Sequence, residues 1–375
     1  MKSQIITVIL AIIIFFVVVG CGLNDQIELE EIPELSFRNI SDLEIGKNYI
    51  CYGDTLILGS IIYQKEEGKY IKQESTLNSL FDIANELAMQ CMQYKNLIIT
   101  VAKDRNAFLI YDMDMNLKYS YSCVEEDMYI GPFWYIYNGY IFYSEWDSKF
   151  IKERTLREIN LQSGDNRTIC RPEEGKGADC TFGEFRIRND GTVVYSIYDK
   201  VEGYMEYWRI KENENGKWEE KKVWETREWE YAHMLDFNQY GLIIFGEFYY
   251  PKSVASYYEI VVIKDNGEVE KINNGNKGEY FFIDNGYFES NITELENVQF
   301  DEDELFPKYF SESVSFYDYE GNVLNTYQMV SKDLLEQGYY LKKLIYDDGK
   351  LTGFYVQKET NELHISQVNV NTGMG

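Results

Sequence analysis

The sequence predicts an all-β protein folded as a single β-propeller. An apolar segment followed by a glycine turn recurs at intervals of about 50 residues, and each interval has room for about four strands. These turn glycines are Gly164, Gly216, Gly267, Gly321 and Gly373. Each unit would form a four-stranded antiparallel blade that buries its faces against its neighbours. Six clear units and an irregular early unit, residues 47–75, favour seven blades, with six as the alternative.

A second turn motif supports the same reading, because Asn or Asp precedes glycine between two apolar segments. It occurs at Asn138-Gly139, Asp190-Gly191, Asn285-Gly286 and Asp348-Gly349, and more loosely around Asn96 and Gly241. Such pairs supply the positive φ angles of tight hairpin turns, and the flanking Tyr, Ile, Val and Phe favour strands. We therefore expect a β-hairpin at each of these positions.

The end of the chain predicts how the ring closes. Gly373 occupies the turn position, yet the sequence stops at Gly375, so the strand that follows this turn in the other units has no counterpart. The last blade would then carry an open edge. We expect an N-terminal segment near Leu35–Ile40 to supply the missing strand.

Two segments of one repeat resemble a known family. Asn138–Tyr143, together with Leu156–Leu161, is similar to the TolB-like propeller repeats of bacterial lipoproteins of uncharacterised function. The resemblance covers residues 90–372 and implies a propeller that binds or scaffolds more often than it catalyses. It carries over no catalytic residue.

The N-terminus has the pattern of a secretory signal. Lys2 precedes an apolar run from Ile5 to Val19, which suits a signal peptide and is short for a membrane span of roughly 20 residues. The run ends in Val18-Val19-Gly20-Cys21, which resembles the bacterial lipobox. The resemblance implies cleavage before Cys21 and a lipid on its sulfur.

This pattern divides the chain into a signal peptide (1–20), an acidic tether (21–34) and the propeller domain (35–375). The alternative is an uncleaved N-terminal anchor. Both readings attach the protein to the cell membrane and place the propeller outside the cytoplasm.

Composition narrows the function classes. The formal net charge of −27 opposes binding to nucleic acid, which needs clustered Lys and Arg.

With two histidines and no C-x-x-C motif, we expect no zinc site and no cofactor. Asp112, Asp114 and Asn116 alternate as in a calcium loop but lack its glycine and distal glutamate, so a polar hairpin turn is the favoured reading. Whether Cys170 and Cys180 form a disulfide is left open.

Aromatic residues are the candidate ligand-binding groups. Trp134, Tyr135 and Trp146 lie in one aromatic-rich hairpin, and aromatic rings beside carboxylates suit sugar rings or peptides. The alternative is packing between blades, because strands pressed face to face need alternating aromatic residues.

The function predicted from these features is a membrane-anchored extracytoplasmic module that binds a peptide, glycan or protein partner. The alternative is a hydrolase or lyase that uses carboxylates as acid and base on an extracellular polymer. We identify no catalytic residue, and the resemblance to the TolB-like repeats favours the binder over the enzyme. An enzyme should show carboxylates with raised pKa values converging at the ring axis, whereas a scaffold should present an apolar or aromatic end face.

Overall fold

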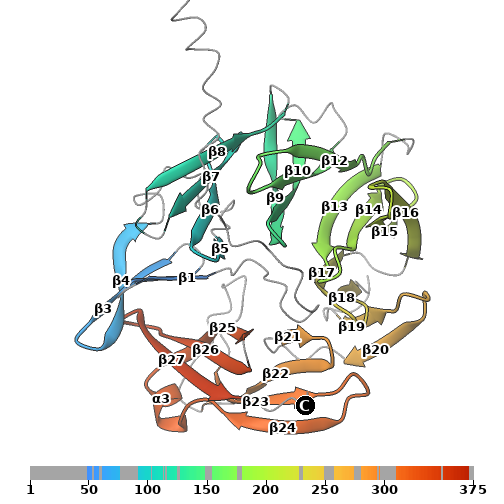
Figure 1. Ribbon diagram of the computed structural model, residues 1–375. Helices are drawn as coiled ribbons and strands as arrows, with labels where there is room; N and C mark the ends of the chain where they lie inside the picture. The colour runs from blue at the N-terminus through green and yellow to red at the C-terminus, as the bar shows by residue number, and fades with distance from the viewer. Residues whose placement is uncertain are drawn as a thin grey trace, which may run out of the picture.

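A computed structural model of the chain describes residues 49–52, 55–58, 61–76, 92–102, 104–112, 114, 116–124, 127–147, 154–174, 180–227, 231–248, 257–273, 280–293, 295, 310–347 and 349–370. The described strands form antiparallel sheets arranged around a ring (Figure 1). The predicted signal peptide and tether, Cys21, and the expected closing segment near Leu35–Ile40 all lie outside the described residues.

Five blades have four strands each, in chain order from the ring axis to the rim. The first two comprise β5 (Met92–Tyr94), β6 (Leu97–Val101), β7 (Ala107–Asp112), β8 (Leu117–Ser122), β9 (Met128–Tyr137), β10 (Tyr140–Asp147), β11 (Thr155–Asn160) and β12 (Asn166–Cys170). The third and fourth comprise β13 (Cys180–Ile187), β14 (Val193–Asp199), β15 (Tyr204–Glu212), β16 (Trp218–Thr226), β17 (Tyr231–Phe237), β18 (Leu242–Phe248), β19 (Tyr257–Ile263) and β20 (Val269–Asn273). The fifth comprises β21 (Tyr280–Ile283), β22 (Gly286–Ile292), β23 (Ser311–Tyr317) and β24 (Val323–Gln328).

The sixth blade combines both parts of the chain. Its strands β25 (Tyr339–Asp347), β26 (Lys350–Gln357) and β27 (Glu362–Asn369) follow a short helix, α3 (Lys332–Glu336). Its outer strand is β4 (Lys69–Thr76), which pairs with β27 through Glu362↔Ile71 and Leu363↔Tyr70. The sheet continues beyond β4 into β3 (Ile61–Glu66), β2 (Thr55–Leu58) and β1 (Tyr49–Tyr52).

The ring therefore has six four-stranded blades and is closed by an N-terminal strand, so the preferred count of seven was wrong and the alternative of six is confirmed. The irregular unit 47–75 is not a separate blade, because its last strand, β4, is the outer strand of the sixth blade. The strand placed beside β27 is β4, at residues 69–76, rather than a segment near residues 35–40.

The hydrophobic cores lie between adjacent blades, and strand alternation produces them. In β10, Ile141 and Tyr143 pack toward blade β5–β8, whereas Phe142 packs toward blade β13–β16. In β18, Ile244 likewise packs toward blade β13–β16, and Ile243 packs toward blade β21–β24. Because successive side chains of a strand point to opposite faces, a doubly buried strand reads as a continuous apolar run.

Both turn motifs come to one end of the ring, which we call the turn face. The inner turns join the first and second strands of each blade, and in the first five blades the outer turns join the third and fourth. The Leu161 amide donates to the Gly139 carbonyl (2.8 Å), which ties an outer turn to an inner turn. Positive φ is confirmed at Asn138, Gly139, Gly191 and Gly349. Within the described ranges, no helix is long and apolar enough to cross a membrane.

Candidate functional site

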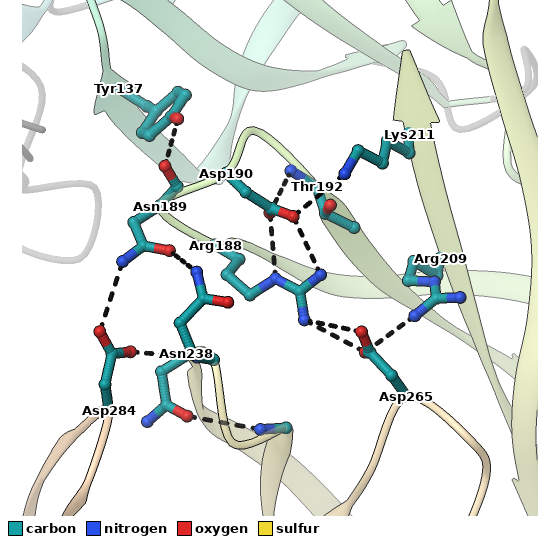
Figure 2. Close-up of polar contacts among 12 residues, drawn as sticks. Tyr137, Arg188, Asn189, Asp190, Thr192, Arg209, Lys211, Asn238, Asp265 and Asp284 are labelled. Atoms are coloured by element: carbon teal, nitrogen blue, oxygen red, sulfur yellow. Dashed lines mark hydrogen bonds and ion pairs between the residues drawn. The ribbon is translucent and has the colours of Figure 1, made fainter. Parts of the chain in front are cut away.

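The inner turns of neighbouring blades contact one another at the turn face (Figure 2). The Tyr137 hydroxyl at the end of β9 donates to the carbonyl of Asn189 in the next blade (2.5 Å). Gln239 lies in the turn between β17 and β18. Its backbone amide donates to Asp284 Oδ1 in the next blade (3.0 Å). The turns that the sequence predicted separately therefore form one connected surface.

Three polar side chains meet there, and we call Asn189, Gln239 and Asp284 the axial trio. Asn189 Nδ2 donates to Asp284 Oδ2 (3.5 Å), and Gln239 Nε2 donates to Asn189 Oδ1. Asn189 and Asp284 belong to blades β13–β16 and β21–β24, which are separated by blade β17–β20. Side chains of non-adjacent blades can meet only close to the ring axis. Asp284 and Gln239 are exposed and Asn189 is half-buried, so the trio offers amide donors and a carboxylate acceptor to solvent.

Asn238 is buried next to Gln239 and fixes the position of its turn by hydrogen bonds. Its Nδ2 donates to Asp236 Oδ2 (2.9 Å) and to the Tyr319 hydroxyl (2.9 Å), and its Oδ1 accepts from the Tyr240 amide (3.0 Å). The Tyr319 hydroxyl donates to the Ile283 carbonyl (2.7 Å), and its ring stacks on Tyr240 with 3.8 Å between centroids. The short turn before β18 is thus fixed to the blade that carries Asp284.

An ion-pair network braces the turn that carries Asn189 (Figure 2). Arg188 is buried and contacts both Asp190 (3.0 Å) and Asp265 of the next blade (3.1 Å). Arg209 also contacts Asp265 (2.8 Å), and Lys211 contacts Asp190 (3.2 Å). Burial opposes ionisation of Asp190, but hydrogen bonds from Arg188 and Thr192 outweigh it and hold the pKa of Asp190 below its usual range.

A second polar group lies deeper on the inner strands, and we call Tyr135, Glu184, Arg186 and Asp236 the inner cluster. Arg186 Nη2 lies 3.1 Å from Glu184 Oε2, and its Nη1 donates to the Tyr135 hydroxyl. Glu184 also accepts from the Met234 amide, and Arg186 donates to the Met234 carbonyl. The guanidinium therefore connects the first strands of three successive blades, β9, β13 and β17.

Asp236 is the member of the inner cluster with a strongly shifted carboxyl. Burial raises its pKa to about 6, and Asp284 adds to the rise, while the Phe237 amide, Asn238 and Arg186 oppose it. Glu184 and Tyr135 are the other titratable groups beside Arg186, and burial raises the pKa of Tyr135 to about 12. Asp236 thus changes charge close to neutral pH.

We expect Asp236→Asn to stabilise the protein at pH 8 by about 2 kcal/mol and to leave its stability at pH 4 nearly unchanged. The folded pKa lies above the unfolded value, so the folded state holds the proton more tightly. The stability from this group is therefore complete below pH 4 and is lost as pH rises through about 6. Asparagine keeps an oxygen for Asn238 and never ionises.

Urea unfolding at the two pH values measures this effect. Asp318→Asn is the matched control, because the amide of Asn322 lowers the pKa of Asp318, which gives the opposite pH dependence. An equal loss of stability for Asp236→Asn at both pH values would show that the ionised carboxylate is itself stabilising.

The structure separates the three predicted ligand-binding aromatics. Trp134 is 1% exposed and packs edge-on against Phe108 in the core between blades, so it is not a surface platform. Tyr135, on the opposite face of β9, joins the inner cluster. Trp146 pairs with Tyr129 near the far end of β9 and stacks under Arg154 at 4.3 Å. Their alternation along the strands therefore fits the packing alternative better than a shared binding surface.

The other candidate groups also have defined surroundings. Asp112 accepts from the amides of Asp114 (3.0 Å) and Asn116 (2.8 Å) and pairs with Lys118 (2.8 Å), as expected for a polar turn. Among the described residues, no group of three or more His, Cys, Asp or Glu is placed to hold a metal ion. Cys170 and Cys180 do not form a disulfide, and the Cys180 thiol contacts Asp199 (3.5 Å). His233 and His364 are exposed on strands β17 and β27.

The sequence reasoning missed the axial trio and, apart from Tyr135, the inner cluster. Asn189, Gln239 and Asp284 stood in motifs interpreted as turns, and no local pattern shows that the turns meet. A signal for the inner cluster was present, because Glu184 and Arg186 interrupt the otherwise apolar strand β13. Charged residues on a strand expected to be buried point to paired groups.

Comparisons with known proteins place the chain only broadly. No protein-family model and no curated protein matches it. A puromycin hydrolase mutant complexed with PGG is 11% identical, with a TM-score of 0.49 over 88% of this chain and 52% of that one. A prolyl endopeptidase is 10% identical, with a TM-score of 0.46 over 87% of this chain and 47% of that one. The β-propeller domain of the Trilobed protease from Pyrococcus furiosus is 10% identical, with a TM-score of 0.44 over 88% of this chain and 86% of that one.

This chain thus spans about half the length of the first two proteins. At such low identity the likenesses are remote, and the assignment of a propeller fold rests on the strand pairing described above. The resemblance to TolB-like repeats stays a prediction.

Proposed function

We propose that this chain is a membrane-anchored extracytoplasmic binding module whose ligand, a peptide or a glycan, contacts the axial trio. The observation that carries the proposal is the meeting of Asn189, Gln239 and Asp284 from three blades at the exposed end of the ring axis. Convergent amide and carboxylate groups on a rigid scaffold are what a polar ligand with its own donors and acceptors requires. Lipid on Cys21 would supply the anchor, and Cys21→Ala would then release the protein from membranes.

The charges around the trio define the kind of ligand. The trio and the networks beneath and beside it contain five carboxylates and four cationic side chains, which leaves one negative charge in excess, and the whole chain carries a net charge of −27. The carboxylates are Glu184, Asp190, Asp236, Asp265 and Asp284, and the cations are Arg186, Arg188, Arg209 and Lys211. A neutral or cationic ligand meets no electrostatic penalty here, whereas an anionic one is repelled.

We expect Asp284→Ala to weaken ligand binding at least about tenfold, because it removes the only charged acceptor of the trio. Binding is measured by surface plasmon resonance on the full chain, with panels of neutral glycans and of uncharged and cationic peptides. Asp318→Ala is the matched control, since this carboxylate lies in an outer turn and bonds within its own turn. Equal affinities for the two variants, with unchanged thermal unfolding, would contradict the proposal.

A hydrolase is the second candidate, and one observation favours it. The pKa of Asp236 is raised to about 6 by burial, while Glu184 of the same cluster lies in an ion pair with Arg186. Two carboxyl groups in such different environments are suited to act as acid and base. Asp236→Asn distinguishes the candidates, because a hydrolase would lose turnover of glycoside or peptide substrates and a binding module would keep its affinity.

A further inference from the structure

The outer strands of five blades form the rim of the ring. In each of these blades the last strand ends the sheet, and no described strand pairs with its outer edge. An open strand edge presents unpaired amide and carbonyl groups that can pair with another chain. Proteins suppress such pairing with charged side chains, especially Lys, and with β-bulges.

Four of the five outer strands carry charges. Strand β8 has Lys118, β12 has Arg167, and β20 has Glu270 and Lys271; β16 has five charged residues. Strand β24, with the sequence VLNTYQ, has none, although charged residues make up 26% of the protein. Its first two residues are also apolar and exposed, Val323 by 56% and Leu324 by 54%.

A comparison of β8 with β24 shows what is missing. Both outer strands carry a β-bulge at their second residue, which is Lys118 in β8 and Leu324 in β24. Lys118 pairs with Asp112 (2.8 Å), the carboxylate at the start of its outer turn. Asp318 stands at the corresponding place before β24, where its carboxylate accepts from Asn322. Strand β24 therefore lacks the lysine that protects the edge of β8, although Asp318 stands where it would pair with such a lysine.

We infer that β24 is an interface at which two copies of this chain pair edge to edge. In an antiparallel pairing about a two-fold axis, Thr326 lies opposite Thr326, Asn325 opposite Tyr327 and Leu324 opposite Gln328 of the second copy. Residues whose backbone groups face the open edge must lie opposite one another, and the Thr326 amide, which donates to the Asn325 side chain (2.8 Å), is such a group. No charges face each other in this register, and the two central threonines are a favourable cross-strand pair.

Self-complementarity is what identifies the partner as a second copy. The same pairing of β16 about its centre would place Lys222 opposite Lys222 and Glu219 opposite Glu225, and pairing β20 would place Lys271 opposite Lys271. Like charges directly opposite are destabilising. Because two copies with a net charge of −27 each repel, they associate where the local charge is lowest, and β24 is that place on the described rim.

Sedimentation velocity on the full chain in mild detergent tests this inference. We expect a dimer for the wild type and at least about tenfold weaker association for Leu324→Lys, which places two cations in the interface. The variant copies the β8 arrangement and offers its ammonium to Asp318, so the blade itself should fold normally. Val269→Lys is the matched control, because Val269 is the exposed first residue of outer strand β20 (40%) and should leave the dimer intact.

Hydrogen exchange completes the experiment. The backbone amides of β24 that face away from β23 should become protected as the protein concentration rises and should stay unprotected in Leu324→Lys. A monomeric wild type would overturn the inference, and so would a dimer that both variants leave unchanged. Protection of these edge-facing amides in a monomer would also overturn it, because another segment of the same chain would then cover the edge.

Discussion

Replacing Arg157 with Met is expected to lower the free energy of unfolding by about 3–5 kcal/mol, because it leaves Glu145 charged and unpaired inside the protein. The side chain of Glu145 is fully buried and that of Arg157 is 7% exposed. Arg157 Nε donates to Glu145, and the Val124 amide donates to Glu145 Oε1 (3.0 Å). The Val124 amide and the Cys123 thiol beside Glu145 cannot replace a guanidinium at a fully buried carboxylate. Guanidinium unfolding of the variant and of the wild type measures this loss.

Two further variants test the cause. Arg157→Met combined with Glu145→Leu removes both charges, and we expect most of the lost stability to return, since apolar replacements of buried ion pairs are often neutral. Lys332→Met is the surface control: the Lys332–Glu336 pair is exposed, and its loss should cost less than about 0.5 kcal/mol. A double variant as unstable as Arg157→Met would show that the guanidinium acts by packing and not by pairing.

The sequence was sufficient to predict the blade unit, because the unit repeats in local chemistry. Turn glycines and alternating aromatic residues predicted the hairpins, and the structure has them at Asn138-Gly139, Gly191 and Gly349. The number of blades depends on which distant strand completes the last sheet. The contact of β4 with β27 is limited to the pairs at Ile71 and Tyr70, and such a pairing leaves no local pattern.

The candidate site depends on a different kind of information. Trp134 and Tyr135 are consecutive in β9 and point to opposite faces, so composition alone could not decide which one is buried. The residues of the axial trio are more than 40 positions apart in sequence. Their contacts arise because the ring places turns of successive blades around one axis.

The two sets of groups near the axis have different relations to solvent. Arg186 and Arg188 are largely withdrawn from water and hold neighbouring blades together, whereas Asp284 and Gln239 are exposed above them. Polar groups that are fully paired inside a protein make the arrangement around them rigid. The axial trio is thus presented on a fixed base, which lowers the entropy that a ligand must overcome on binding.

Gly286→Ala is expected to destabilise the protein by about 3 kcal/mol, for a reason that its Asn-Gly motif does not suggest. Gly286 begins β22 and does not have positive φ. A Cβ there would collide with the Tyr317 carbonyl oxygen of β23 and lie 2.9 Å from the Phe316 ring, and backbone on the neighbouring strand cannot move aside cheaply.

Gly321 offers the opposite case for comparison. Its φ is +87°, and a Cβ at this outer turn would meet nothing within 4 Å. Gly321→Ala should therefore cost about 1 kcal/mol from left-handed strain alone, and Gly321→Asn less, because Asn tolerates this conformation. Gly286→Asn should be at least as damaging as Gly286→Ala, since the obstacle is space and not φ. Thermal unfolding of the four variants measures these differences, and a milder effect for Gly286→Asn than for Gly286→Ala would contradict the steric explanation.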